Sequence, residues 1–218
     1  METLYERIIR QLDTLVPFLG LAHEEVFDLI RQEHEHWFST EQEKALPSTF
    51  DSYRNQVSQS AFLLGYSYFE AFLADLVREI YRHRPQMLPH EKQIKYSDVL
   101  RQHDLEGLIG QMIEREVIAI FYESAEGIAK YFEQRLQIQW PERDGKHMLE
   151  RVSLVRNCII HNAARVDRRL AAASDWGEGD IITLAPSDVH EYGIEARDFA
   201  RDVYAQAESK HPANTGNA

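Results

Sequence analysis

The chain has 218 residues, of which 44% are hydrophobic and 11% aromatic, and it carries a formal net charge of −12. This apolar content is enough to build a core and excludes a wholly disordered protein. The acidic total argues against a protein that coats nucleic acid through a broad basic surface. The single cysteine, Cys158, cannot form an internal disulfide or a metal site alone, which argues against a redox function and fits a reducing compartment.

The sequence has no features of a membrane or exported protein. No uncharged apolar run approaches the roughly 20 residues that a membrane helix needs. The first residues, Met1 to Arg7, lack the basic and then apolar order of a signal peptide. We therefore expect a cytoplasmic protein without a membrane segment.

The first half of the chain is dominated by helical patterns. Residues 4–37 have apolar positions at helical spacing with a break near Pro17 and Gly20, which predicts two helices or one kinked helix, and residues 38–48 form a polar connection that ends at Pro47. The strongest pattern follows, with apolar residues every three or four positions at Phe62, Tyr66, Phe69, Leu73, Leu76 and Ile80. This seam predicts a central core helix that ends at residues 82–85.

The second half predicts further helices with short connections. We expect a short helix capped by Ser97 or Asp98, a helix from Leu105 towards Phe121 and one from about Ser124 to Leu136. After a loop at residues 140–145, a regular apolar seam predicts a helix that ends at His161-Asn162; its members are Met148, Val152, Val155 and Ile159.

The last part of the chain adds a turn-like region and a final helix. Residues 181–184 have the composition of a short strand, and Ser187 can cap a last helix that extends past Val203. No large apolar residue follows Tyr204, so residues 209–218 are predicted to be a disordered tail. The prediction is one all-α domain over residues 1–208.

The end of the helix that starts near Met148 combines an arginine with a histidine. On a regular helix Asn157 and His161 share a face, whereas Arg156 and His161 diverge by about 140° unless the helix ends or opens there. A histidine can transfer a proton, and an arginine can hold a phosphate and offset developing charge, which together suffice for metal-free cleavage of RNA. Residues 151–170 hold five arginines and one acid, a local net charge of +4. This patch is a candidate anion site in an acidic protein.

Two segments carry a family resemblance. The stretch Leu154-Val-Arg-Asn-Cys-Ile-Ile-His-Asn162 resembles the Arg-Asn-x-x-x-His-Asn form of the catalytic signature of the HEPN ribonuclease superfamily. Upstream, Ser67-Tyr-Phe-Glu-Ala-Phe-Leu73 resembles the early helix of prokaryotic HEPN proteins, in which an acid lies within an aromatic-rich core segment. The order of the predicted helices is also similar to that family. One departure is that many relatives carry a glycine soon after His-Asn, where this chain has Ala163 and Ala164.

The resemblance implies a HEPN-like helical bundle that forms a homodimer, so that two motif helices approach each other. It implies a metal-independent endoribonuclease without a cofactor, acting on RNA in a toxin–antitoxin pair, in phage defence or in RNA processing, with an antitoxin or regulatory protein as a possible partner. Arg156 and His161 would be catalytic, Asn157 would orient the histidine or the phosphate, and Asn162 would support the end of the helix. The alternative is a non-catalytic HEPN-type module that binds nucleotide, RNA or protein through the same cleft. A helical scaffold without a ligand is a third interpretation.

Several other residues have two interpretations each. Glu70 borders the apolar seam of the central helix, where it would either be partly buried beside a cation such as Arg156 or be exposed at the edge. The trio Arg165, Arg168 and Arg169 would either contact RNA phosphates or form a solvated helix face.

Two candidates for other chemistry are weaker. Cys158 lies between apolar residues with no adjacent base, which favours a buried structural thiol over a nucleophile. His34 and His36 point away from each other on a helix, and the sequence contains none of the common metal or nucleotide motifs, so we expect no metal site.

Overall fold

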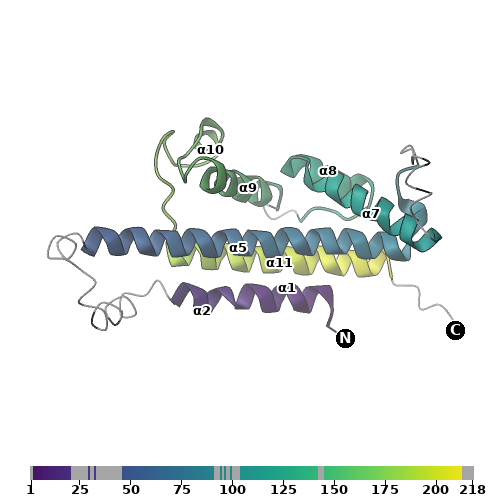
Figure 1. Ribbon diagram of the computed structural model, residues 1–218, viewed down its shortest axis with the longest axis horizontal. Coiled ribbons are helices and arrows are strands. Elements are labelled where there is room, and N and C mark those ends of the chain that lie inside the picture. Colours follow the sequence, from purple (N-terminus) through teal and green to yellow (C-terminus); the bar gives the residue numbers. More distant parts are fainter. Residues whose placement is uncertain are drawn as a thin grey trace. The chain divides into compact units, whose positions relative to one another are not determined.

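The computed structural model describes residues 2–20, 46–90, 104–141 and 145–212, with isolated positions 29, 32, 94, 96 and 99. Within these residues the chain is all-α, as predicted (Figure 1). The helices are α1 (Leu4–Asp13), α2 (Leu15–Gly20), α5 (Leu46–His83), the 3-10 helix η2 (Pro85–Met87), α7 (Leu105–Phe121), α8 (Ala125–Gln134), α9 (Gly145–His161), α10 (Arg168–Ala172) and α11 (Pro186–Lys210).

The described residues contain no strand. The short strand considered for residues 181–184 is replaced by a single antiparallel bridge between Arg165 and Ile181. The polar groups of this segment are instead bound by side chains of α5, which takes away the need for a sheet partner.

The N-terminal segment forms two helices from Leu4 onward, as predicted. Thr3 caps α1 through a capping box with Glu6, and the chain breaks at Thr14 instead of at Pro17. Pro17 lies in the first turn of α2, where a missing N–H group costs no hydrogen bond. Of the predicted continuation of this segment, Val26 and Ile30 lie outside the described residues.

The central helix forms as predicted and is longer. All six residues of the apolar seam are buried, none more than 8% exposed. The helix starts at Leu46, so Pro47 lies in its first turn and not in the preceding connection, and it ends at His83, two residues before Pro85. Ser97 and Asp98, predicted to cap a short helix, lie outside the described residues.

The chain divides into two compact units, and α5, α9 and α11 contribute to both. The first unit comprises Met1–Phe69 and Arg151–Asp198. In it α1 lies beside α11, and an ion pair joins Asp13 to Arg197 (Figure 1). The rings of Phe62 and Tyr192 lie 5.1 Å apart between α5 and α11. A Cβ atom at Gly65 would lie 3.3 Å from the Tyr192 ring, so the glycine permits this close packing.

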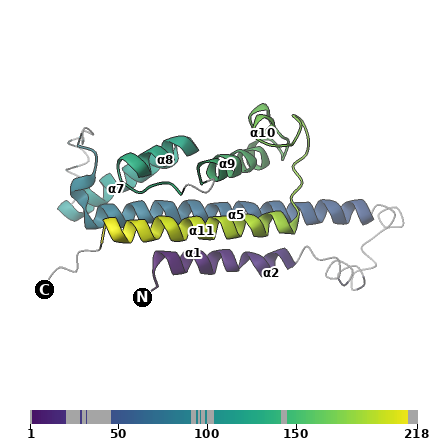
Figure 2. The same cartoon turned by 180° about the vertical axis from the view of Figure 1, so that it is seen from behind.

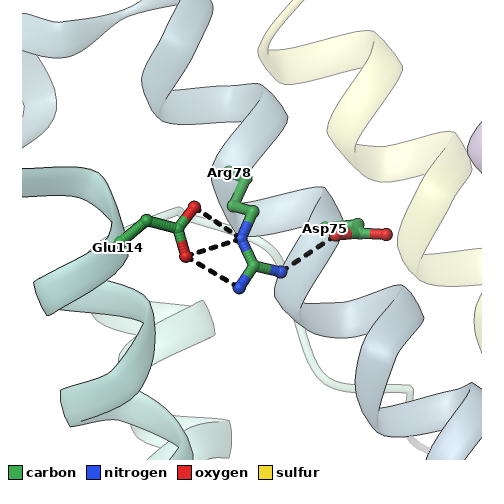
Figure 3. A network of polar contacts seen from close by, with 3 residues as sticks. All are labelled: Asp75, Arg78 and Glu114. Atoms are coloured by element: carbon green, nitrogen blue, oxygen red, sulfur yellow. Dashed lines mark hydrogen bonds and ion pairs between the residues drawn. The ribbon is translucent and has the colours of Figure 1, made fainter. Parts of the chain in front are cut away.

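The second unit comprises Glu70–Glu150 and Phe199–Ala218. Trp140 packs edge-on against Phe132 of α8 and Phe199 of α11, with ring centroids 5.1 and 4.8 Å away. Two polar networks accompany this core. One is an arginine on α5 that binds acids on α5 and α7 (Figure 3). In the other, a buried acid on α7 accepts a hydrogen bond from a tyrosine of α8, and the hydroxyl of that tyrosine also bonds to a tyrosine of α5.

The C-terminal helix starts one residue before the predicted cap. The Asp188 carboxylate accepts a hydrogen bond from the Ala185 N–H at 2.8 Å, so Ser187 lies inside α11 and is not its cap. The helix runs to Lys210, two residues into the predicted tail, and His211 Nε2 lies 2.6 Å from the Leu136 carbonyl oxygen. Residues 213–218 lie outside the described part.

One stretch of α5, Asp51–His83, is long and apolar enough to cross a membrane by composition alone. Half of its most apolar 18-residue segment is buried inside the fold, as in the core helix of a soluble protein. The stretch is therefore compatible with the predicted absence of a membrane segment.

Candidate functional site

Arg156 lies on α9 above an aromatic ring of α5. Its guanidinium carbon is 5.6 Å from the centroid of the Tyr66 ring, within the range of a cation–π interaction. The Tyr66 hydroxyl lies 3.2 Å from the Ser153 hydroxyl, one turn earlier on the same face of α9. Tyr66 thus contacts two successive turns of α9, and its ring supports the guanidinium of Arg156.

Asn157 completes the surroundings of this arginine. Its Oδ1 accepts a hydrogen bond of 3.0 Å from Nη1 of Arg156. Arg156 is half-buried, whereas Asn157 is exposed. The asparagine therefore orients the guanidinium.

His161 is the last residue of α9 and is exposed. Within the described part of the chain no hydrogen bond or ion pair involves its side chain. The imidazole therefore faces solvent instead of packing against the core, as a residue that contacts a substrate must. The carbonyl groups at this helix end favour cationic and hydrogen-bond-donating groups.

The helix stays regular through the motif. The Asn162 N–H donates to the Cys158 carbonyl at 3.0 Å, which continues the helical hydrogen-bond pattern past His161. The directions of Arg156 and His161 therefore differ by about 140° around the helix axis, and no hydrogen bond joins them among the described residues. One copy of the chain places the two side chains on the same helix end without pairing them.

The turn after His161 uses two alanines in the left-handed region. Ala163 has φ 50° and Ala164 has φ 59°, positions that favour glycine. This backbone lets the Ala164 N–H reach the Cys158 carbonyl at 3.0 Å, and the Asn162 side chain donates to the Arg165 carbonyl at 2.7 Å. A left-handed turn, which glycine would favour, thus occurs here with two alanines, and Asn162 stabilises it as expected of a residue that terminates a helix.

Two polar side chains of α5 fix the chain beyond this turn. Asn55 and Gln59 donate to the Ile182 carbonyl at 3.1 and 2.9 Å, and Asn55 Oδ1 accepts from the Leu184 N–H at 2.9 Å. The Ile182 N–H in turn donates to the Ala164 carbonyl at 2.8 Å. The position of the turn after His161 is therefore tied to α5 through residues 182–184.

The arginines after the motif lie on the surface. Arg165, Arg168 and Arg169 are exposed, and Arg165 donates to the Gly179 carbonyl at 3.4 Å. The only acid of the stretch, Asp167, caps α10 by accepting a hydrogen bond of 2.8 Å from the Leu170 N–H. Figure 2 shows α10 just beyond the end of α9. Asp167 thus serves the helix cap, and the three arginines are exposed next to the motif.

The other predicted residues do not join this group. Glu70 is half-buried on α5 and belongs to the second unit, so a pairing with Arg156 of the first unit stays a prediction. Cys158 is 1% exposed, and burial raises the pKa of its thiol, which confirms a buried cysteine. The described residues contain no group of three or more potential metal ligands, and His34 and His36 lie outside them.

Sequence reasoning missed the residues that support the motif. Tyr66 was assigned to the core only, and Ser153, Asn55 and Gln59 were not singled out. The three-residue spacing of Ser153 and Arg156 places them on one helix face, which is a usable signal for a shared partner. The two polar residues of α5 carried no such signal, because polar positions on a helix usually face water.

No model of a known protein family matches this chain, and no curated protein or solved structure matches it either. The geometry of the residues above is therefore the basis for a functional assignment.

Proposed function

We propose that this chain is a metal-independent endoribonuclease of the HEPN type, with His161 and Arg156 as its reacting pair. The observation that carries the proposal is the end of α9, where an exposed histidine follows an arginine that Tyr66 and Asn157 hold in place. Two side chains, those of Tyr66 and Asn157, thus orient the guanidinium of Arg156. Such orientation is what binding and stabilising a phosphate requires.

The proposed reaction needs a base, an acid and a cation. A His161 imidazole takes the proton of a ribose 2′-hydroxyl, whose oxygen attacks the adjacent phosphorus. The bond from phosphorus to the 5′ oxygen breaks, and that oxygen receives a proton from a second imidazole. The products are a 2′,3′-cyclic phosphate and a 5′-hydroxyl. Arg156 holds the phosphate oxygens, and Asn157 keeps the guanidinium oriented.

We infer that a homodimer supplies the second imidazole. In a single copy Arg156 and His161 diverge on a regular helix, so the pair converges only when another motif helix approaches. Ile160, beside His161, is 47% exposed and offers apolar area for that contact. The exposed Arg165, Arg168 and Arg169 would hold flanking RNA phosphates. We place this activity in the cytoplasm, in a toxin–antitoxin or phage-defence setting with an antitoxin as partner.

The alternative is a HEPN-type module that binds RNA, nucleotide or protein without cleaving it. The divergence of Arg156 and His161 favours this alternative if two copies do not associate. The same arginines would then contact phosphates, and His161 would serve as a surface donor only.

Incubation of the purified protein with mixed RNA in EDTA tests the proposal. We expect cleavage by the wild type, loss of cleavage in His161→Ala and no change in His190→Ala, which alters an exposed histidine of α11. Intact RNA that co-purifies with the wild type would identify the binding module. Equal cleavage by wild type and His161→Ala would reject the proposed site.

A further inference from the structure

The first unit contains a cavity of about 580 Å³ between α9, the start of α11 and the segment after α10. Its floor is apolar, and the floor residues are at most 8% exposed: Phe62, Val152, Val155, Leu184 and Tyr192. This volume and this floor are typical of sites for small molecules. Neither Arg156 nor His161 lines the cavity.

The rim of the cavity is acidic. Four carboxylates line it, from Asp175, Asp188, Glu191 and Glu195. The only cation among the described lining residues is Arg151, so the net charge of the lining is −3, from four acids and one base. Trp176, half-buried in the segment after α10, adds an aromatic wall.

Two of the four acids already have partners within the fold. Glu195 pairs with Arg151 at 3.2 Å, and Asp188 accepts the Ala185 N–H at the start of α11. Asp175 and Glu191 are exposed at the rim, and the described residues give them no ion pair. Two carboxylates with a tryptophan beside them over an apolar floor thus face the cavity.

We propose that this cavity binds a linear aliphatic polyamine. The methylene segments of such a molecule would cover the apolar floor, while its ammonium groups would reach the separate carboxylates of the rim and the face of Trp176. A compact metal ion would make no use of the floor, and an anion would be repelled by the net charge. A triamine would balance the net charge of the lining. This site is separate from the proposed ribonuclease site and does not depend on it.

Titration calorimetry with spermidine tests the proposal on the full chain at constant ionic strength. We expect one saturable site in the wild type and a loss of affinity of about tenfold or more in the double variant Asp175→Asn/Glu191→Gln. The matched control is Asp51→Asn/Glu178→Gln, which removes the same charge from two exposed positions that do not line the cavity. The control should bind like the wild type.

A second variant tests the cavity itself without a change of charge. Ala173 lines the cavity and is exposed at its edge, so Ala173→Trp should fill the space and abolish spermidine binding, with circular dichroism reporting the fold. Equal spermidine affinities in all variants would overturn the proposal. It would also be overturned if sodium chloride or magnesium chloride displaced spermidine as readily as they displace diffusely bound counterions. A lysine-rich peptide that binds in the cavity when spermidine does not would overturn it in favour of a protein partner.

Discussion

The guanidinium of Arg156 lies 5.6 Å from the centroid of the Tyr66 ring, so a buried tyrosine of the central helix supports the arginine of the proposed active site. The same tyrosine contacts Ser153 through its hydroxyl, and the two contacts connect α5 to successive turns of α9. The position of the arginine therefore depends on helix packing as well as on its own helix.

Replacement of Tyr66 separates these two contacts. Tyr66→Phe keeps the ring and removes the hydroxyl, so we expect RNA cleavage close to that of the wild type. Tyr66→Leu removes the ring, and we expect cleavage to fall by about tenfold or more because the arginine is no longer held in place. Steady-state kinetics measure the effect, and circular dichroism checks the fold. Equal loss in both variants would show that the ring does not position Arg156.

Ala163 adopts a left-handed backbone with φ 50°, which is costly for a residue with a Cβ atom. We expect Ala163→Gly to raise the free energy of unfolding by about 0.5–1 kcal/mol. Ala205→Gly is the control, because Ala205 is exposed in the interior of α11 and its replacement should lower the free energy of unfolding by a similar amount. Urea denaturation measures both values. A destabilised Ala163→Gly protein would contradict the strain inferred for the turn.

Arg78 holds Glu114 of α7 and Asp75 of α5, each at 2.9 Å (Figure 3). Hydrogen bonds from Arg78 lower the pKa of Glu114 below its ordinary value. A lowered pKa contributes stability at pH values above the unfolded-state pKa, and this contribution is lost as the pH falls through the folded-state pKa. Because the Glu114 side chain is 46% exposed, the contribution is modest.

We therefore expect Glu114→Gln to lower the free energy of unfolding by about 0.5–1 kcal/mol at pH 7. The difference from the wild type should shrink below about pH 4.5, as Glu114 becomes protonated in both states. Urea denaturation at several pH values measures it, with Glu178→Gln as an exposed control. A difference that is constant or grows in acid would contradict the assigned direction of the pKa shift.

The carboxylate of Glu116 is buried and accepts a hydrogen bond of 2.7 Å from the Tyr131 hydroxyl, which also bonds to the Tyr81 hydroxyl. Tyr131→Phe removes this hydrogen bond to the carboxylate and should lower the free energy of unfolding by about 1–3 kcal/mol. Tyr81→Phe leaves that bond intact and should cost less. Thermal denaturation can rank them against Tyr122→Phe, whose ring is exposed. Equal stability of Tyr131→Phe and Tyr122→Phe would show that the network contributes nothing.

Features with a local cause could be predicted from the sequence. The seam of the central helix and the end of α9 at His161 follow from apolar spacing, and both were confirmed. The burial of Glu116 could have been predicted as well, because it lies on the face of α7 that carries Ile113 and Ile120. A break between two helices was predicted near Pro17 and Gly20, and one lies at Thr14, because proline is also tolerated in a first helical turn.

Features that depend on distant segments could not be predicted. The contacts of Asn55 and Gln59 with Ile182 join residues more than 120 positions apart, and nothing in the local pattern indicates them. The support of Arg156 by Tyr66 also needs the packing of two helices. The convergence of Arg156 with His161 would need a second copy of the chain, which local sequence patterns do not determine.

The chemical identity of the product ends distinguishes the proposed metal-independent ribonuclease from other nucleases. The wild type is incubated in EDTA with a DNA strand that contains a single ribonucleotide, and mass spectrometry identifies the fragments. We expect the wild type to cleave only at the ribonucleotide and to leave a 2′,3′-cyclic phosphate on one fragment and a 5′-hydroxyl on the other. With His161→Ala the strand should stay intact. Cleavage at deoxyribonucleotides, 3′-hydroxyl and 5′-phosphate ends, or full activity of His161→Ala would contradict it.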